Sequence, residues 1–144
     1  MDIRLALRRV LIADAGLTAL VANRIFGGKL PQRITDPAIV IRLHESDDIM
    51  ILNSPGVSNL TKSTFRFGCV VRGDEDDAYD KVCDIDIELR RVLQGIRGQI
   101  SDGNSPEETL QIVGTWRIHT TDFYDDPTES YWVRSDWEVH HALA

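Results

Sequence analysis

Four segments of the chain alternate between apolar and polar residues, and this two-residue period constrains the fold more than any other feature. The segments are residues 38–44, 64–72, 110–120 and 131–140. Successive side chains of a β-strand point to opposite faces of its sheet, so each segment predicts a strand with one apolar and one largely polar face. The residues expected on the apolar face are Ile39, Ile41, Leu43, Phe65, Phe67, Cys69, Val71, Leu110, Ile112, Trp116, Ile118, Tyr131, Val133, Trp137 and Val139.

Two amphipathic helices are predicted around these strands. Near the N-terminus, apolar residues recur at helical spacing behind Asp2, which can cap the helix, and a short helical turn follows a break at Asp14. The second helix is expected at residues 74–95, where acidic residues at the start and Arg90 with Arg91 near the end suit the helix dipole. Its apolar stripe is wide enough to cover a sheet.

The order along the chain is therefore α-β-β-α-β-β, which predicts an α+β fold. We expect a four-stranded, mainly antiparallel sheet with the two main helices packed on one face. At 144 residues the chain suits a single domain, residues 1–144, because that length encloses one hydrophobic core. A long loop, residues 45–63, separates the first two strands, and a loop of this length is unusual unless it serves a function.

Composition and charge argue against several classes of protein. Hydrophobic residues make up 42% of the chain and charged residues 27%, which is typical of a soluble globular protein. The net charge is −7 and the Lys and Arg residues are scattered, so binding of nucleic acid through the outer surface is disfavoured. Arg8 and Arg9 interrupt the first apolar stretch, so we expect no signal peptide and no contact with a membrane.

The sequence contains no motif that predicts catalysis or cofactor binding. The spacings typical of nucleophile elbows, phosphate loops, dinucleotide-binding turns and zinc proteases are absent. His44, His119 and His140 fall toward one side of the predicted sheet, but solvated strand histidines are the favoured interpretation over a metal site. Cys69 and Cys83 are expected to be reduced packing residues. We therefore predict that the protein is not an enzyme and has no catalytic residue, cofactor or metal.

Two features are candidate contact surfaces with another subunit or a partner. One is an apolar run inside the long loop, which needs a surface to cover, either the protein's own core or a sheet edge, or a neighbouring subunit. The other is the polar strand face, which is either plain solvated sheet or a charge-complementary contact between identical subunits. The candidate residues are Ile49, Met50, Ile51 and Leu52 in the run and Arg66, Arg117, Arg134, Asp136 and Glu138 on the strands.

Several short patterns follow one another in an order and spacing that span nearly the whole chain. They are the step at residues 13–17 after the opening helix, the turn at 21–26, the strand start at 37–41, the strand at 65–72 leading into an acidic-headed helix, the helix end at 93–95, and the aromatic-rich strand after Tyr131. In these patterns the chain resembles the small tail-completion or tail-terminator proteins of long-tailed bacteriophages and prophages. The long loop departs from the shorter versions of that family.

The resemblance implies a virion structural protein that forms a homo-oligomeric ring, commonly a hexamer, at the head-proximal end of the tail tube. Such a ring ends tube polymerisation and offers a docking surface to the head connector. The implied partners are copies of the chain itself, the tail tube protein and the head-tail connector protein, with DNA only as a passing cargo through the lumen. The implied location is the tail or neck of the virion, after assembly in the cytoplasm of a host bacterium.

Two alternatives stay open beside this interpretation. Another neck protein, such as a head-completion or connector subunit, has the same size and the same need to form a ring. A small enzyme or ligand-binding α+β domain belongs to a different class and predicts a pocket with convergent polar groups and perturbed acids.

Overall fold

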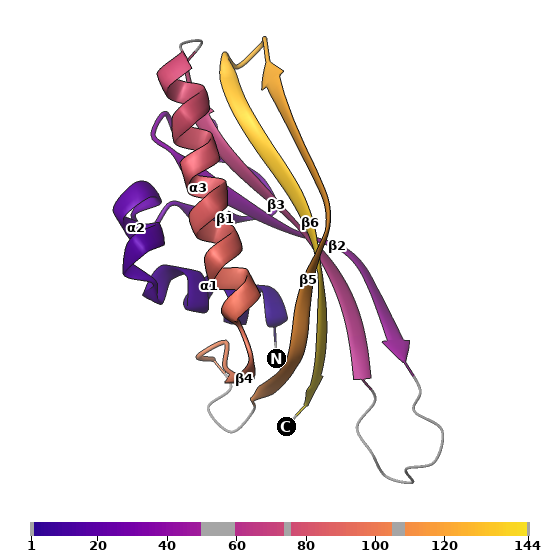
Figure 1. Ribbon diagram of the computed structural model, residues 1–144. Coiled ribbons are helices and arrows are strands. Elements are labelled where there is room, and N and C mark those ends of the chain that lie inside the picture. Colours follow the sequence, from indigo (N-terminus) through magenta and orange to yellow (C-terminus); the bar gives the residue numbers. More distant parts are fainter. Residues whose placement is uncertain (1, 50–59, 74–75, 105–108, 144) are drawn as a thin grey trace, which may run out of the picture.

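The computed structural model, which describes residues 2–49, 60–73, 76–104 and 109–143, contains one mixed sheet and three helices (Figure 1). The strands are β1 (Ile25–Gly27), β2 (Ala38–Ile49), β3 (Leu60–Arg72), β4 (Gly98–Ile100), β5 (Leu110–Asp125) and β6 (Ser130–Leu143), and the helices are α1 (Ile3–Ala13), α2 (Ala15–Val21) and α3 (Asp76–Gly95). The six strands lie in the order β1-β2-β3-β6-β5-β4. The sheet twists strongly and curves like half a barrel, with all three helices on one face.

The predicted four-stranded sheet with two main helices is wrong. Strand β1 pairs in parallel with β2, and β4 pairs antiparallel with β5, so the sheet has six strands and is mixed. The short turn predicted after Asp14 is a third helix, α2, which Asp14 caps by accepting a hydrogen bond from the Leu17 backbone N–H at 3.0 Å. Strands of three residues are too short to show a two-residue period, which is why β1 and β4 escaped prediction.

The long strands also run further than predicted. Strand β2 continues to Ile49 and β3 begins at Leu60, so both ends of the predicted loop at 45–63 are part of a hydrogen-bonded ladder. Strand β5 likewise continues past the predicted end at residue 120 and ends at Asp125. In Figure 1 the β2–β3 pair therefore extends well past the helices.

The helix ends agree in part with the predicted caps. The Asp2 side chain accepts hydrogen bonds from the backbone N–H groups of Arg4 and Leu5 at the start of α1. Arg91 lies before the last turn of α3, because that helix continues to Gly95, and it does not interact with the helix end as expected. Instead it forms ion pairs with Asp14 at 2.6 Å and with Glu88, and so ties α3 to the start of α2. Residues 74 and 75, where the second helix was expected to begin, lie outside the described residues.

The hydrophobic core lies between the helices and the covered face of the sheet. Burying a large apolar side chain contributes roughly 1.5–3 kcal/mol, so the largest fully buried side chains contribute most. These are Trp137, Phe65, Phe67, Leu7, Leu11, Leu17, Ile25, Ile39, Ile41, Ile85, Leu89 and Leu93. Cys69 is fully buried among them as predicted, and burial raises the pKa of its thiol well above the usual value.

Three residues predicted to face the core are exposed instead. Trp116 is 49% exposed, and Leu43 and Ile118 are each 54% exposed. A β-bulge after Ile112 shifts the alternation of β5 by one residue, and such a shift moves the following side chains to the other face. The structure therefore places Trp116 on the outer face and turns Arg117 toward the helices.

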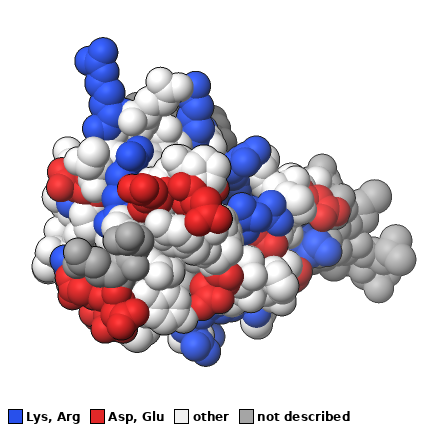
Figure 2. Space-filling model, turned by 90° about the horizontal axis from the view of Figure 1, so that it is seen from above, with Lys and Arg blue, Asp and Glu red and all other residues white. Residues whose placement is uncertain are grey.

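Charged side chains of both signs are spread over the surface. Figure 2 looks at the molecule from above and shows acidic and basic groups interspersed, with neither covering the visible face. This pattern agrees with the scattered Lys and Arg residues of the sequence. In the described part of the chain, no helix is both long enough and apolar enough to cross a membrane.

Candidate functional site

The outer face of the sheet, which the helices leave uncovered, carries four of the five predicted polar contact residues. Arg134, Asp136 and Glu138 are alternate residues of β6 and therefore point to the same side. Arg66 on β3 is directly opposite Asp136, and Arg134 is directly opposite Gly68. The structure thus brings Arg66, Arg134, Asp136 and Glu138 together from two neighbouring strands.

A two-point ion pair stands at the centre of this face. Arg66 Nε donates to Asp136 Oδ1 at 2.9 Å and Arg66 Nη2 donates to Asp136 Oδ2 at 3.2 Å. The pKa of the Asp136 carboxyl is lowered from its usual value of 3.8, chiefly by the hydrogen bonds from Arg66, and His44 and His119 shift it in the same direction. The side chain of Asp136 is only 11% exposed, so its charge depends on this partner.

We expect the Asp136→Asn variant to lose a contribution to stability that depends on pH. Because the folded pKa of Asp136 lies below 3.8, the contribution is complete above that value and is lost as the pH falls through the folded pKa. The difference in urea midpoint between wild type and variant is therefore expected to be largest near neutral pH and to shrink below about pH 4. The exposed Asp84→Asn variant is the control, and a pH-independent difference for Asp136→Asn would contradict the prediction.

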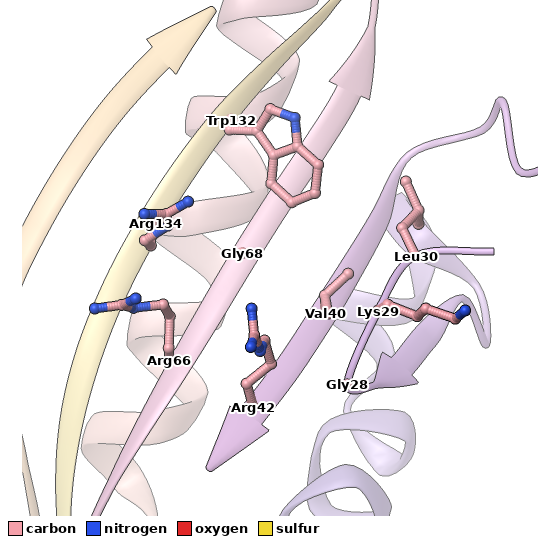
Figure 3. A pocket seen from close by; sticks show the side chains of 9 residues that line it. All are labelled: Gly28, Lys29, Leu30, Val40, Arg42, Arg66, Gly68, Trp132 and Arg134. Carbon is pink, nitrogen blue, oxygen red and sulfur yellow. The ribbon is translucent and has the colours of Figure 1, made fainter. Parts of the chain in front are cut away.

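Beside the ion pair lies a hollow of about 250 Å³ that gathers positive charge (Figure 3). Its lining consists of Gly28, Lys29, Leu30, Val40, Arg42, Arg66, Gly68, Trp132 and Arg134. Arg42, Arg66 and Arg134 come from the three neighbouring strands β2, β3 and β6, and Arg42 is directly opposite Arg66. Asp136 already compensates the charge of Arg66, so an anionic group in the hollow would chiefly offset the charges of Arg42 and Arg134.

The floor of the hollow is an indole held rigidly over a glycine. A Cβ atom at Gly68 would lie 3.0 Å from the ring of Trp132, so the glycine lets the ring lie across β3 without being displaced. Trp132 Nε1 donates to Ser130 Oγ at 3.0 Å, and the ring stacks on Phe123 with centroids 6.1 Å apart. The Arg134 guanidinium lies over the other aromatic ring, 5.0 Å from the centroid of Phe123.

The residues of the hollow that lie outside the alternating segments were not predicted from the sequence. Lys29 and Leu30 follow the short strand β1 and reach the outer face only because β1 pairs with β2. Gly68 did carry a signal, since a glycine inside a strand often marks a close approach of another group. The pairing partner that uses this space, Trp132, is not evident from the local sequence.

Arg117, the fifth predicted contact residue of the strands, lies on the covered face. Its Nη2 donates to both carboxylate oxygens of Asp86 on α3, at 3.0 and 2.8 Å, and both side chains are only 15% exposed. Its guanidinium also lies 6.0 Å from the ring centroid of Trp137. This residue therefore fastens α3 to the sheet.

The predicted apolar contact run falls at the end of β2. Ile49 is the last residue of that strand and its backbone pairs with Leu60, while its side chain and Met50, Ile51 and Leu52 lie outside the described residues. Within the described ranges, no group of three or more His, Cys, Asp or Glu side chains is placed to hold a metal ion.

The same fold occurs in a virus-like particle. A chain in the solved virion of a native gene transfer agent particle matches 95% of this chain and 92% of its own length, with a TM-score of 0.69. The two sequences are 14% identical, so the likeness shows a shared fold. No family model matches the sequence, and no curated protein does.

Proposed function

We propose that the protein is a structural subunit of a phage-like virion. The observation that carries this proposal is the near-complete match to a chain of a gene transfer agent virion, since it covers almost the full length of both chains. A fold alone does not define a function. The outer sheet face adds a site of the kind that binds another protein, with an aromatic floor and three guanidinium groups.

Within the virion, the proposed role is a ring at the head-proximal end of the tail tube that ends tube polymerisation and docks the head connector. The resemblance to tail-terminator proteins supports this finer assignment. Its proposed partners are copies of itself, the tail tube protein and the connector protein, while DNA passes through the lumen as cargo. A cyclic ring needs two different complementary surfaces on each subunit.

The proposed role is not enzymatic and involves no cofactor. The hollow on the outer face is lined by guanidinium, amine, aliphatic and indole groups. Its lining includes no hydroxyl, thiol, imidazole or carboxyl side chain, and these groups usually act as nucleophiles or general bases. Such a lining favours binding of an anionic segment of a partner over chemistry.

Light scattering and electron microscopy of tube assembly test the proposal. The mass of the purified protein is measured alone and after mixing with the tail tube protein of the same genome, and tube lengths are measured with and without it. We expect a ring, or a monomer that becomes a ring on the tube, together with shorter tubes. A protein that stays monomeric and leaves tube length unchanged would overturn the terminator role.

The same experiment separates the terminator from another neck protein. A head-completion or connector subunit is expected to bind the portal-side protein of the head and to ignore the tube. The fold likeness fits either place in a virion, so this binding partner decides between them.

A further inference from the structure

Near each edge of the sheet, a long strand has a neighbouring strand on one side only over most of its length. Strand β1 covers β2 only at residues 39–41, and within the described residues β2 then runs to Ile49 with β3 as its single neighbour. Strand β4 covers β5 only at residues 110–112, and β5 then runs to Asp125 with β6 as its single neighbour. Such edges expose a row of unpaired N–H and C=O groups that another strand can bind.

These two free edges also carry exposed apolar side chains. On β5, Val113 and Ile118 are each 54% exposed and Trp116 is 49% exposed, and on β2 Leu43 is 54% exposed. Val113 and Ile118 occupy the two β-bulges of β5, where the pairing with β6 shifts. The bulges therefore bring aliphatic groups, and no charged ones, to the free edge.

The free edges carry only part of the protection that usually prevents association. Lysine, proline and inward-pointing charges protect exposed edges in soluble proteins. Residues 42–49 and 113–125 contain neither lysine nor proline. The first segment carries four charged residues, Arg42, Glu45, Asp47 and Asp48. In the second segment Arg117 is paired with Asp86 across the covered face, and Asp122 accepts a hydrogen bond from Tyr79. The β5 edge, which is long and exposes three apolar side chains, is therefore expected to be covered.

We infer that the free edge of β5 in one copy of the chain pairs with the free edge of β2 in the next copy. A strand edge needs another strand, and the same chain supplies one on the opposite side of its own sheet. Each contact leaves one free β2 edge and one free β5 edge at the two ends of the growing assembly. Such head-to-tail contacts close into a ring when the rotation between copies adds up to a full turn. The inference rests on the proposed ring and identifies its two surfaces.

Charged substitutions at each edge test the inference. One variant carries Val113→Lys and Ile118→Lys on β5, and a second carries Leu43→Lys on β2. Because these side chains are already exposed, both variants are expected to fold, and far-ultraviolet circular dichroism checks this. The matched control is Leu20→Lys, which changes an apolar side chain on α2 that is 36% exposed, since α2 packs on α1 and α3 and lies on neither edge.

We expect each edge variant alone to fall from the assembled mass to that of one chain, 16.2 kDa, while the control keeps the assembled mass. An equal mixture of the two edge variants is expected to form a dimer and nothing larger, because one intact β2 edge meets one intact β5 edge. If the wild type assembles only on tail tube protein, the same comparison is made in that mixture.

Three other outcomes would contradict the inference, and they distinguish loss of the edge contact from loss of the ring. Edge variants that keep the wild-type assembled mass would overturn the edge contact and leave the ring intact. A dimer formed by the Leu43→Lys variant alone would show symmetric β5–β5 pairing and would also overturn the inference. A wild type that never assembles, alone or with tube protein, would remove the proposed ring and this inference together.

Discussion

Replacing Trp137 by alanine is expected to lower the free energy of unfolding by about 3–5 kcal/mol. Trp137 is 1% exposed and lies on β6, directly opposite Phe65 of β3 and Arg117 of β5. Its Nε1 donates to Ser135 Oγ at 3.0 Å, so the ring is held both by packing and by a buried hydrogen bond. Truncation leaves a cavity in the centre of the core and a buried hydroxyl without this donor.

The Trp116→Ala variant is a matched control for this loss. Trp116 is the same residue type on the neighbouring strand, but it is 49% exposed on the outer face. We expect its removal to cost about half as much or less, because only about half of its surface leaves water on folding and its loss opens no enclosed cavity. Urea unfolding followed by far-ultraviolet circular dichroism measures both variants without relying on tryptophan fluorescence. Equal losses for the two variants would show that the core is not arranged as described.

Replacing Asp86 by alanine is expected to lower the free energy of unfolding by about 3 kcal/mol. The change leaves the guanidinium of Arg117 beneath α3 without its carboxylate, at a place where the side chain is only 15% exposed. The Nε of Arg117 is already buried with no hydrogen-bond partner among the described residues. Removal of one partner from such a pair costs more than the pair itself contributes, because a charge stays behind without compensation.

A second variant separates the effect of an unpaired Arg117 charge from the effect of lost packing at this place. In the Asp86→Leu, Arg117→Met double variant both charges are replaced by apolar groups, and we expect a stability close to that of the wild type. The exposed pair of Lys81 and Asp77 on the same helix serves as a control, and Asp77→Ala is expected to change stability by no more than about 0.5 kcal/mol. Urea midpoints measure all three, and a double variant as unstable as Asp86→Ala would contradict the argument.

The parts of the fold that follow from the sequence are those with several repeats of a pattern. Strands β2, β3, β5 and β6 and helices α1 and α3 were predicted close to their true positions, because each is long enough to show its period. The three-residue strands β1 and β4 depend on neighbours in space and leave no such pattern. The six-stranded mixed sheet was therefore not predictable from alternation alone.

The faces of the strands were less predictable than the strands themselves. A single β-bulge after Ile112 exchanged the expected positions of Trp116 and Arg117. Its local sign is Gly114 beside it, since a glycine inside a strand often marks a bulge, but a glycine does not say which way the alternation shifts. On β6, where the alternation is regular, Arg134, Asp136 and Glu138 face outward together as predicted. The hollow next to them also needs the register between β3 and β6, which the sequence does not fix.

The pairing of β3 with β6 also determines how the chain must fold. Arg66 and Asp136 meet across this ladder although they lie 70 residues apart in the sequence. The hairpins β2–β3 and β5–β6 can each form locally, but their union closes a long loop, and this entropic cost comes before any contact compensates for it. Until then α3, which joins the two hairpins, has no complete sheet to cover. Refolding is therefore expected to be slow for a chain of this size and to succeed best in dilute solution, where half-formed sheets rarely meet one another.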